Sequence, residues 1–141
     1  MENAAIVFLS ATGNTEAMAD AVKAGAQEAG AEVSVFAACD FSADMVADFD
    51  AIAFGCPAMG DEVLEEDEFQ PMFDSVLPEL NGKKVALFGS YGWGDGQWMR
   101  DWEKVCLESG VDFACGCVIA NESPDDEAIA ACKKLGAALV S

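Results

Sequence analysis

The chain has 141 residues, of which 52% are hydrophobic, and its 26 acidic and seven basic side chains give a net charge of −19. This length fits one domain, residues 1–141, and the apolar content excludes a disordered chain. So acidic a chain disfavours nucleic acids and anionic membrane surfaces as partners and favours proteins with a basic patch. Taken alone, however, a high net charge is explained by default as a means of keeping the protein soluble.

The sequence contains no sign of a membrane anchor or of export. Its longest apolar runs are about six to ten residues, whereas a membrane-spanning helix needs about 20. The N-terminal segment lacks the basic residues and the apolar centre of a secretory signal. We therefore expect a cytoplasmic protein.

The cysteines favour buried free thiols over a disulfide framework. They include no Cys-x-x-Cys pair, and the chain has no histidine, so neither a zinc site nor an iron–sulfur site is expected. Most of them lie in apolar segments, where a free thiol behaves as a small hydrophobic side chain. The six are Cys39, Cys56, Cys106, Cys115, Cys117 and Cys132.

In the first part of the chain, apolar runs alternate with amphipathic stripes. The run from Ala4 to Leu9 predicts a first strand, and apolar positions at helical spacing between Thr15 and Ala29 predict a helix that ends at Gly30. Three further segments follow: a strand at 32–38, one or two helical turns at 41–49 and a strand at 50–55.

The second part of the chain continues the alternation. A stripe from Phe69 to Leu77 predicts a helix with Pro71 in its first turn. Next come a strand at 83–89, a helix marked by Trp98, Trp102, Val105 and Cys106 and closed by Gly110, and a strand at 111–120. Ser123-Pro124-Asp125-Asp126 then provides a cap, a proline and acids for a last helix, whose buried face is Ile129, Cys132, Gly136, Leu139 and Val140.

These segments make five βα units. Strands that are apolar without alternation are buried on both faces, which indicates a parallel sheet with helices on both sides. A chain this short fits a doubly wound three-layer α/β sandwich, with a five-stranded sheet of order 2-1-3-4-5, better than a closed barrel. In such sheets ligands bind at the carboxyl ends of the strands, beside strand 1.

The loop after the first strand, SATGNTE, has the composition of an anion site. Ser10, Thr12 and Thr15 offer hydroxyl groups, Asn14 an amide, and Gly13 lets the backbone N–H groups turn inward at the start of a helix. The loop has no lysine or arginine and no Walker motif, so it suits a phosphate monoester held by dipoles. The alternative is an ordinary polar turn.

Two later loops are expected at the same edge of the sheet. In GCPAMGDE, Met59 is suited to lie against a flat ring, and Gly60 tolerates a positive φ. In SYGWGDG, Trp93 stands between glycines and offers a stacking surface. Each alone has a simpler explanation: a capped turn with one methionine, or a tryptophan folded onto its own loop. Together with the first loop they fit a flat aromatic group that carries a phosphate, and flavin mononucleotide (FMN) is the natural candidate.

At these residues the chain resembles the short-chain flavodoxins of clostridia and related anaerobes. The motifs S-x-T-G-N-T-E, G-C-P-A-M-G-D-E and F-G-S-Y-G-W-G-D-G-x-W-M carry the resemblance, which covers essentially the whole chain. Ala11 departs from a glycine that is common in the family, and Leu9 from an aromatic residue. The resemblance implies a flavodoxin-like fold and a bacterial one-electron carrier, not an enzyme, in which FMN alternates between semiquinone and hydroquinone.

The resemblance also implies roles for the loop residues. The first loop would bind the phosphate, Met59 and Trp93 would flank the isoalloxazine, Gly60 would accept a hydrogen bond from flavin N5–H, and Glu62 would hold flavin N3–H. The implied cofactor-binding residues are Ser10, Ala11, Thr12, Gly13, Asn14, Thr15, Pro57, Ala58, Met59, Gly60, Asp61, Glu62, Ser90, Tyr91, Gly92, Trp93 and Gly94.

The implied partners are redox proteins with basic docking patches, such as ferredoxin or flavodoxin reductases and other oxidoreductases. The protein itself is expected to be a monomer.

Two alternatives to this function remain. An FMN-dependent quinone or nitro reductase would need a substrate pocket, for which these loops look short. A receiver-type regulatory module would need clustered aspartates at strand ends and a lysine after the last strand, but the chain has Leu9-Ser10 and Asn121-Glu122-Ser123 there.

Overall fold

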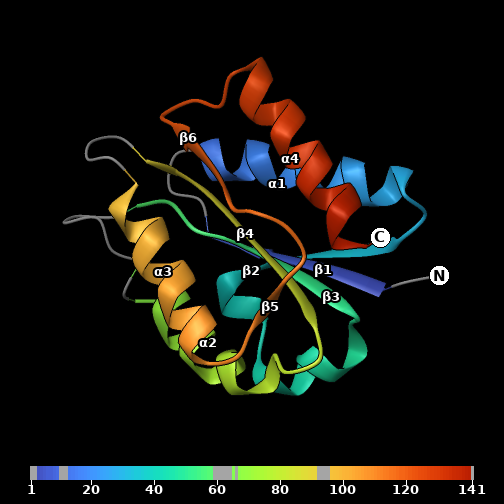
Figure 1. Cartoon of the computed structure of the whole chain (residues 1–141), viewed down its shortest axis with the longest axis vertical. Coiled ribbons are helices and arrows are strands. Elements are labelled where there is room, and N and C mark those ends of the chain that lie inside the picture. Colours follow the sequence, from blue (N-terminus) through green and yellow to red (C-terminus); the bar gives the residue numbers. More distant parts are fainter. Residues whose placement is uncertain (1–2, 10–12, 59–64, 66, 92–95, 141) are drawn as a thin grey trace.

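A twisted parallel sheet lies between two layers of helices (Figure 1). The fold comes from a computed structural model, which describes residues 3–9, 13–58, 65, 67–91 and 96–140. In these ranges the elements are β1 (Asn3–Phe8), α1 (Asn14–Glu28), β2 (Glu32–Ala37), the 3₁₀ helices η1 (Ala38–Asp40) and η2 (Ala43–Asp48), β3 (Ala51–Gly55), α2 (Phe69–Val76), the 3₁₀ helix η3 (Leu77–Glu79), β4 (Lys84–Tyr91), α3 (Gln97–Glu108), β5 (Asp112–Phe113), β6 (Val118–Asn121) and α4 (Asp126–Leu139).

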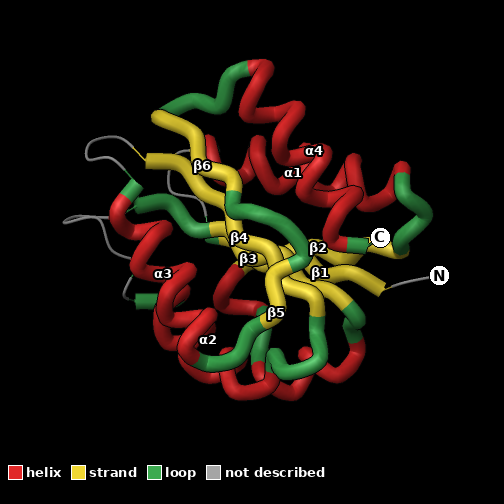
Figure 2. The backbone as a smooth tube through the Cα atoms, in the orientation of Figure 1, coloured by secondary structure: helices red, strands yellow, loops and turns green. Residues whose placement is uncertain are grey.

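The predicted strand order is confirmed. The sheet runs β2-β1-β3-β4-β5, and every pairing is parallel. Ile6 of β1, for example, pairs with Val35 of β2 on one side and Ala53 of β3 on the other. The chain therefore reverses its direction of winding beside β1, and the carboxyl ends of β1 and β3 flank that point. Figure 2 shows the strands of the sheet between the helices.

The predicted fifth strand at 111–120 is wrong in one respect, because it is two short strands. β5 pairs with β4 at Lys84 and Val85, and β6 pairs with β4 from Phe88 onward. Between them the backbone leaves the ladder, while Cys115 and Cys117 pack against opposite faces of the sheet. The apolar composition therefore continues through a break in backbone pairing, which is why the sequence suggested one strand.

Side chains from successive strand positions pack on opposite sides of the sheet. In β1, Ala4 and Ile6 belong to the core under α1 and α4, whereas Ala5 and Val7 belong to the core under α2 and α3. All five residues of β3 are buried, as expected for a central strand. β2 differs from the prediction of strands buried on both faces: it lies at the edge, and its Val35 is 43% exposed.

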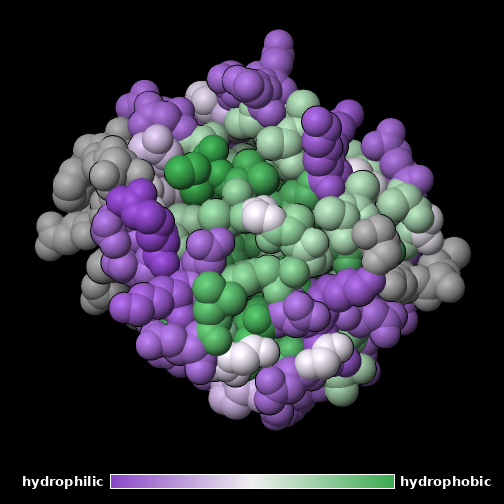
Figure 3. All heavy atoms as spheres, in the orientation of Figure 1, coloured by the Kyte–Doolittle hydropathy of each residue, from purple (hydrophilic) through white to green (hydrophobic). Residues whose placement is uncertain are grey.

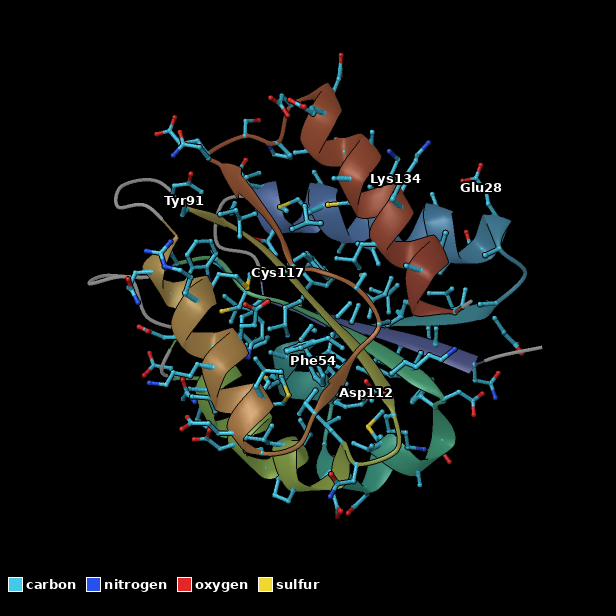
Figure 4. The ribbon with its side chains drawn as sticks, in the orientation of Figure 1. Glu28, Phe54, Tyr91, Asp112, Cys117 and Lys134 are labelled. Atoms are coloured by element: carbon cyan, nitrogen blue, oxygen red, sulfur yellow. The ribbon has the colours of Figure 1, made fainter. Side chains whose placement is uncertain are left out.

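The core under α2 and α3 is built from aromatic rings. Phe54 of β3 meets Phe73 of α2 edge to face, with ring centroids 5.1 Å apart, and Trp102 of α3 meets Phe69 at 5.3 Å. Figure 4 shows Phe54 between the sheet and these helices. Pro71 lies in the first turn of α2 as predicted. Val105 of the predicted α3 stripe is 46% exposed and does not belong to this core.

On the other side of the sheet, α1 and α4 touch through their backbones. A methyl group on Gly25 of α1 would overlap the carbonyl oxygen of Lys133, and one on Gly136 of α4 would overlap that of Val22. The two glycines thus let the helix axes approach more closely than larger side chains allow. α4 starts as its sequence predicts, with the Asp125 carboxylate accepting a hydrogen bond from the Ala128 N–H group at 2.8 Å.

Candidate functional site

The carboxyl ends of β1, β3 and β4 are tied together by backbone hydrogen bonds. The N–H group of Leu9 donates to the Gly55 carbonyl at 3.0 Å, and that of Cys56 to the Phe88 carbonyl at 3.2 Å. One step further, Ala58 donates to the Ser90 carbonyl at 2.9 Å. The loops after these strands therefore start side by side at one edge of the sheet.

Helix α1 begins at this edge in a form suited to an anion. Its N-cap, Gly13, has φ +91°, and the helix start has no side-chain cap hydrogen bond. A Cβ added at Gly13 would meet nothing within 4 Å, so the space beside this backbone is open. The first turn of a helix carries N–H groups without helical acceptors and a partial positive charge, which an anion can satisfy.

Two hydroxyl groups, one from α1 and one from β4, meet at this helix start. Thr15 of α1 and Ser90 of β4 are 1% and 4% exposed, and their side-chain oxygens are 3.2 Å apart. The contact joins the first loop to the end of β4. Asn14 beside them is half-buried. The structure thus brings together Gly13, Asn14, Thr15 and Ser90, which sequence reasoning placed in two separate loops.

The ends of β3 and β4 approach so closely that only glycine fits at position 89. A methyl group on Gly89 would overlap the Cys56 carbonyl oxygen. That oxygen accepts a hydrogen bond from the Trp98 indole N–H at 3.2 Å. The Trp98 ring in turn lies 5.5 Å from that of Tyr91, centroid to centroid. Trp98 therefore connects the loop after β3 with the loop after β4.

The remaining described site residues line the same edge. Pro57, Ala58 and Tyr91 are each half-buried, and Figure 4 shows Tyr91 at the end of β4. The Tyr91 carbonyl accepts a hydrogen bond from the Glu122 N–H group at 2.6 Å, which adds the end of β6 to the edge. The predicted site residues outside the described ranges are Ser10, Ala11, Thr12, Met59, Gly60, Asp61, Glu62, Gly92, Trp93 and Gly94.

Sequence reasoning missed three residues here: Gly89, Trp98 and Glu65. Gly89 and Trp98 belong to the third motif but were expected only as parts of a strand and a helix, and no individual role was predicted for Glu65. The Glu65 carboxylate accepts hydrogen bonds from three backbone N–H groups at the start of α2. Burial acts to raise the pKa of this carboxyl, but these three donors outweigh it and hold the pKa below its ordinary value. One signal was available: an acid four residues before the first helical residue, Phe69.

Other kinds of site receive no support from the described residues. In these ranges no group of three or more histidine, cysteine, aspartate or glutamate side chains is placed to hold a metal ion. The cysteines are all free thiols, with Cys56, Cys106 and Cys132 buried and Cys39, against expectation, exposed. No helix in the described part of the chain is long and apolar enough to cross a membrane.

The residues at this edge fit the phosphate end of FMN. Gly13 leaves open space at a helix start, and two buried hydroxyl groups lie beside it. A family model described as Flavodoxin matches residues 6–136 of the chain. The chain belongs to the flavodoxin family.

Relatives of this flavodoxin match it over most of their length. It is 47% identical over 133 residues to a flavodoxin of Megasphaera elsdenii, covering 94% of this chain and 95% of the relative. It is 46% identical over 121 residues to a flavodoxin of Clostridium beijerinckii, covering 86% and 88%. The solution structure of two-electron reduced M. elsdenii flavodoxin matches with a TM-score of 0.89 at 46% identity, covering 97% and 98%.

Family membership confirms several predictions from the sequence. The short-chain clostridial resemblance, the doubly wound fold and FMN as cofactor are all borne out. Flavodoxins are electron carriers that exchange electrons with redox partner proteins, and they are not enzymes. This decides against the reductase and the receiver-module alternatives.

Proposed function

We propose that this flavodoxin is a low-potential, one-electron carrier that works between the semiquinone and the hydroquinone of FMN in the cytoplasm. The observation that carries the proposal is the charge around the cofactor edge. The three loops, residues 10–16, 56–62 and 90–96, contain no lysine, arginine or histidine, but four acids. Negative charge added to the flavin by reduction would therefore find no cation in these loops to neutralise it.

The size of this effect follows from Coulomb's law. One carboxylate at roughly 10 Å raises the energy of an added negative charge by about 0.4 kcal/mol in a water-like medium. For one electron this corresponds to about 20 mV, so several carboxylates together lower the second potential by roughly 100 mV. The carboxylates in or near the loops are Glu16, Asp61, Glu62, Glu65, Glu66, Asp67 and Asp95.

We assign the phosphate to the start of α1. Hydroxyl groups of Ser10, Thr12 and Thr15 and the Asn14 amide would bind it, together with the backbone N–H groups of the loop, which includes Ala11 and Gly13. The support is the open space at Gly13 and the buried hydroxyl pair of Thr15 and Ser90. Anchoring by dipoles binds the phosphate without a lysine or arginine in the loop.

We assign the ring to the loops after β3 and β4. Met59 and Trp93 would flank it, Gly60 would hydrogen-bond flavin N5–H, and Glu62 would hold N3–H. The remaining contacts would come from the backbone of Pro57, Ala58, Asp61, Ser90, Tyr91, Gly92 and Gly94. The support is the position of Ala58 and Tyr91 at one edge, with Ala58 hydrogen-bonded to Ser90.

A reductive titration tests the proposal. The FMN-loaded protein is reduced stepwise with dithionite while its visible spectrum and potential are recorded. We expect a blue neutral radical to accumulate midway, followed by a second one-electron step at clearly lower potential. Both electrons entering in a single step, or a purified apoprotein that takes up no FMN, would refute it.

A further inference from the structure

A single side chain, that of Glu65, organises the turn that leads into α2. One carboxylate oxygen accepts from the Glu68 and Phe69 N–H groups at 2.7 and 2.8 Å, and the other from Asp67 at 2.8 Å. The Glu65 backbone carbonyl accepts from Gln70 at 2.8 Å. Three successive N–H groups at a helix start thus share one negatively charged acceptor, which is an arrangement of strong hydrogen bonds.

Glu65 also lies near the end of β3. Its backbone N–H group and its carboxylate both act on the thiol of Cys56, a residue that is fully buried. Burial raises the pKa of this thiol to about 12, the Glu65 N–H group acts in the opposite direction, and the Glu65 carboxylate raises it further. The thiol is therefore protonated at neutral pH, and it donates to the Pro57 carbonyl at 3.5 Å.

These contacts fix both ends of the stretch between Ala58 and Glu65. At the first end, Ala58 is hydrogen-bonded to Ser90, and the Cys56 carbonyl is held by the Trp98 indole. At the other end, Glu65 is held by the start of α2. The residues between include Met59 and Gly60, assigned above to the flavin ring. Fixing the ends of a binding loop beforehand reduces the entropy that ligand binding must overcome.

We propose that Glu65 is a positioning residue for FMN: its carboxylate fixes the point where the ring-binding loop returns to α2. The inference rests on the proposed assignment of that loop to the flavin ring. A carboxylate that acted only through its charge would be matched by any neighbour of equal charge. If the carboxylate only capped α2, its removal would change the stability of the protein without changing FMN affinity or the flavin potentials.

Matched substitutions separate these possibilities. Glu68 carries the same charge three residues further on, and it is exposed. We would compare Glu65→Ala and Glu65→Gln with Glu68→Ala and Glu68→Gln. The readouts are the FMN dissociation constant, the two one-electron potentials, thermal unfolding of the apoprotein, and amide hydrogen exchange of residues 67–69 in the apoprotein.

The expected pattern singles out position 65. Glu65→Ala raises the FMN dissociation constant at least tenfold and shifts the first potential, whereas Glu68→Ala changes the dissociation constant less than twofold. Glu65→Gln, which keeps one acceptor oxygen, lies between them. Both glutamine variants raise the second potential alike, because each removes one charge. Exchange at the Phe69 N–H group accelerates only in the position-65 variants.

Two results would overturn this inference while leaving the proposed function intact. One is a wild type that binds FMN and reduces in two separate steps while Glu65→Ala and Glu68→Ala bind FMN equally well. The other is a Glu65→Gln protein with lowered thermal stability but unchanged FMN affinity and first potential, which would leave Glu65 as a cap of α2 only. A wild type that takes up no FMN would instead overturn the proposed function, and the inference with it.

Discussion

The contact between Thr15 and Ser90 joins the start of α1 to the end of β4 through one pair of atoms. Both hydroxyl groups are buried, and their oxygens lie 3.2 Å apart. A buried hydroxyl that loses its partner costs about 1–3 kcal/mol. The contact between them therefore fixes the position of the Thr15 hydroxyl group at the start of α1, where the phosphate is proposed to bind.

We expect Thr15→Val to raise the FMN dissociation constant about tenfold or more, because a hydrogen bond to a charged group is worth about 1.5–3 kcal/mol. Riboflavin, which has the ring but no phosphate, should bind both proteins within a factor of two. Fluorescence titration with the two ligands measures this. Equal losses for FMN and riboflavin would show that Thr15 acts on the ring or on folding, not on the phosphate.

Several residues at this edge follow from the sequence, and several do not. The hydroxyl and glycine pattern of the first loop predicted the positions of Gly13 and Thr15, because a helix start needs polar groups of that kind. Gly89 and Trp98 were not predicted, since their roles depend on the distance between β3 and β4. Glu65 was not predicted either, because its role depends on the turn that its carboxylate closes.

At the scale of elements, the packing of α1 on α4 makes a sharp prediction. Gly25→Ala favours helix by about 1 kcal/mol, but its methyl group would overlap the Lys133 carbonyl oxygen. Backbone atoms cannot move aside as a side-chain end can, so overpacking should prevail and cost about 1–3 kcal/mol net. Urea denaturation of the apoprotein measures this free energy of unfolding.

Gly116→Ala is the matched control for this substitution. Position 116 has no heavy atom within 4 Å of an added Cβ, so the change in unfolding free energy should stay within about 0.5 kcal/mol. A stabilised Gly25→Ala protein would contradict the close backbone contact and indicate that the two helices can separate without cost.

The elements themselves were largely predictable from hydrophobic periodicity. Each main helix and strand begins and ends within a few residues of its expected place, and Gly30 and Gly110 follow the ends of α1 and α3. Periodicity failed where side chains and backbone behave differently. Cys115 and Cys117 are packed against the sheet as in a strand, but their backbone is unpaired with β4. The one sign of this break in the sequence is Gly116, which lies between the two cysteines.

At the scale of the whole molecule, charge should control the encounter with partners. The face in Figure 3 has hydrophobic side chains near its centre and hydrophilic ones around them, and the chain carries a net charge of −19. Long-range attraction then raises the association rate with a basic partner without a large interface. We propose that the protein meets such partners as a monomer.

The second-order rate of electron transfer to a strongly basic redox protein should therefore fall at least about tenfold between low and high ionic strength, as screening shortens the range of the attraction. Stopped-flow spectroscopy measures it. An acidic redox protein serves as the control, and its rate should rise with salt. A flat salt dependence with the basic partner would contradict docking through the acidic surface.

The interruption between β5 and β6 also affects how separate copies of the molecule meet. The outer margin of a sheet presents unpaired N–H and C=O groups, to which a foreign strand can add. Here that margin offers only the two residues of β5 and the four of β6, separated by a stretch that leaves the ladder. Among the described residues, this side therefore offers a foreign strand no continuous template to which it could add.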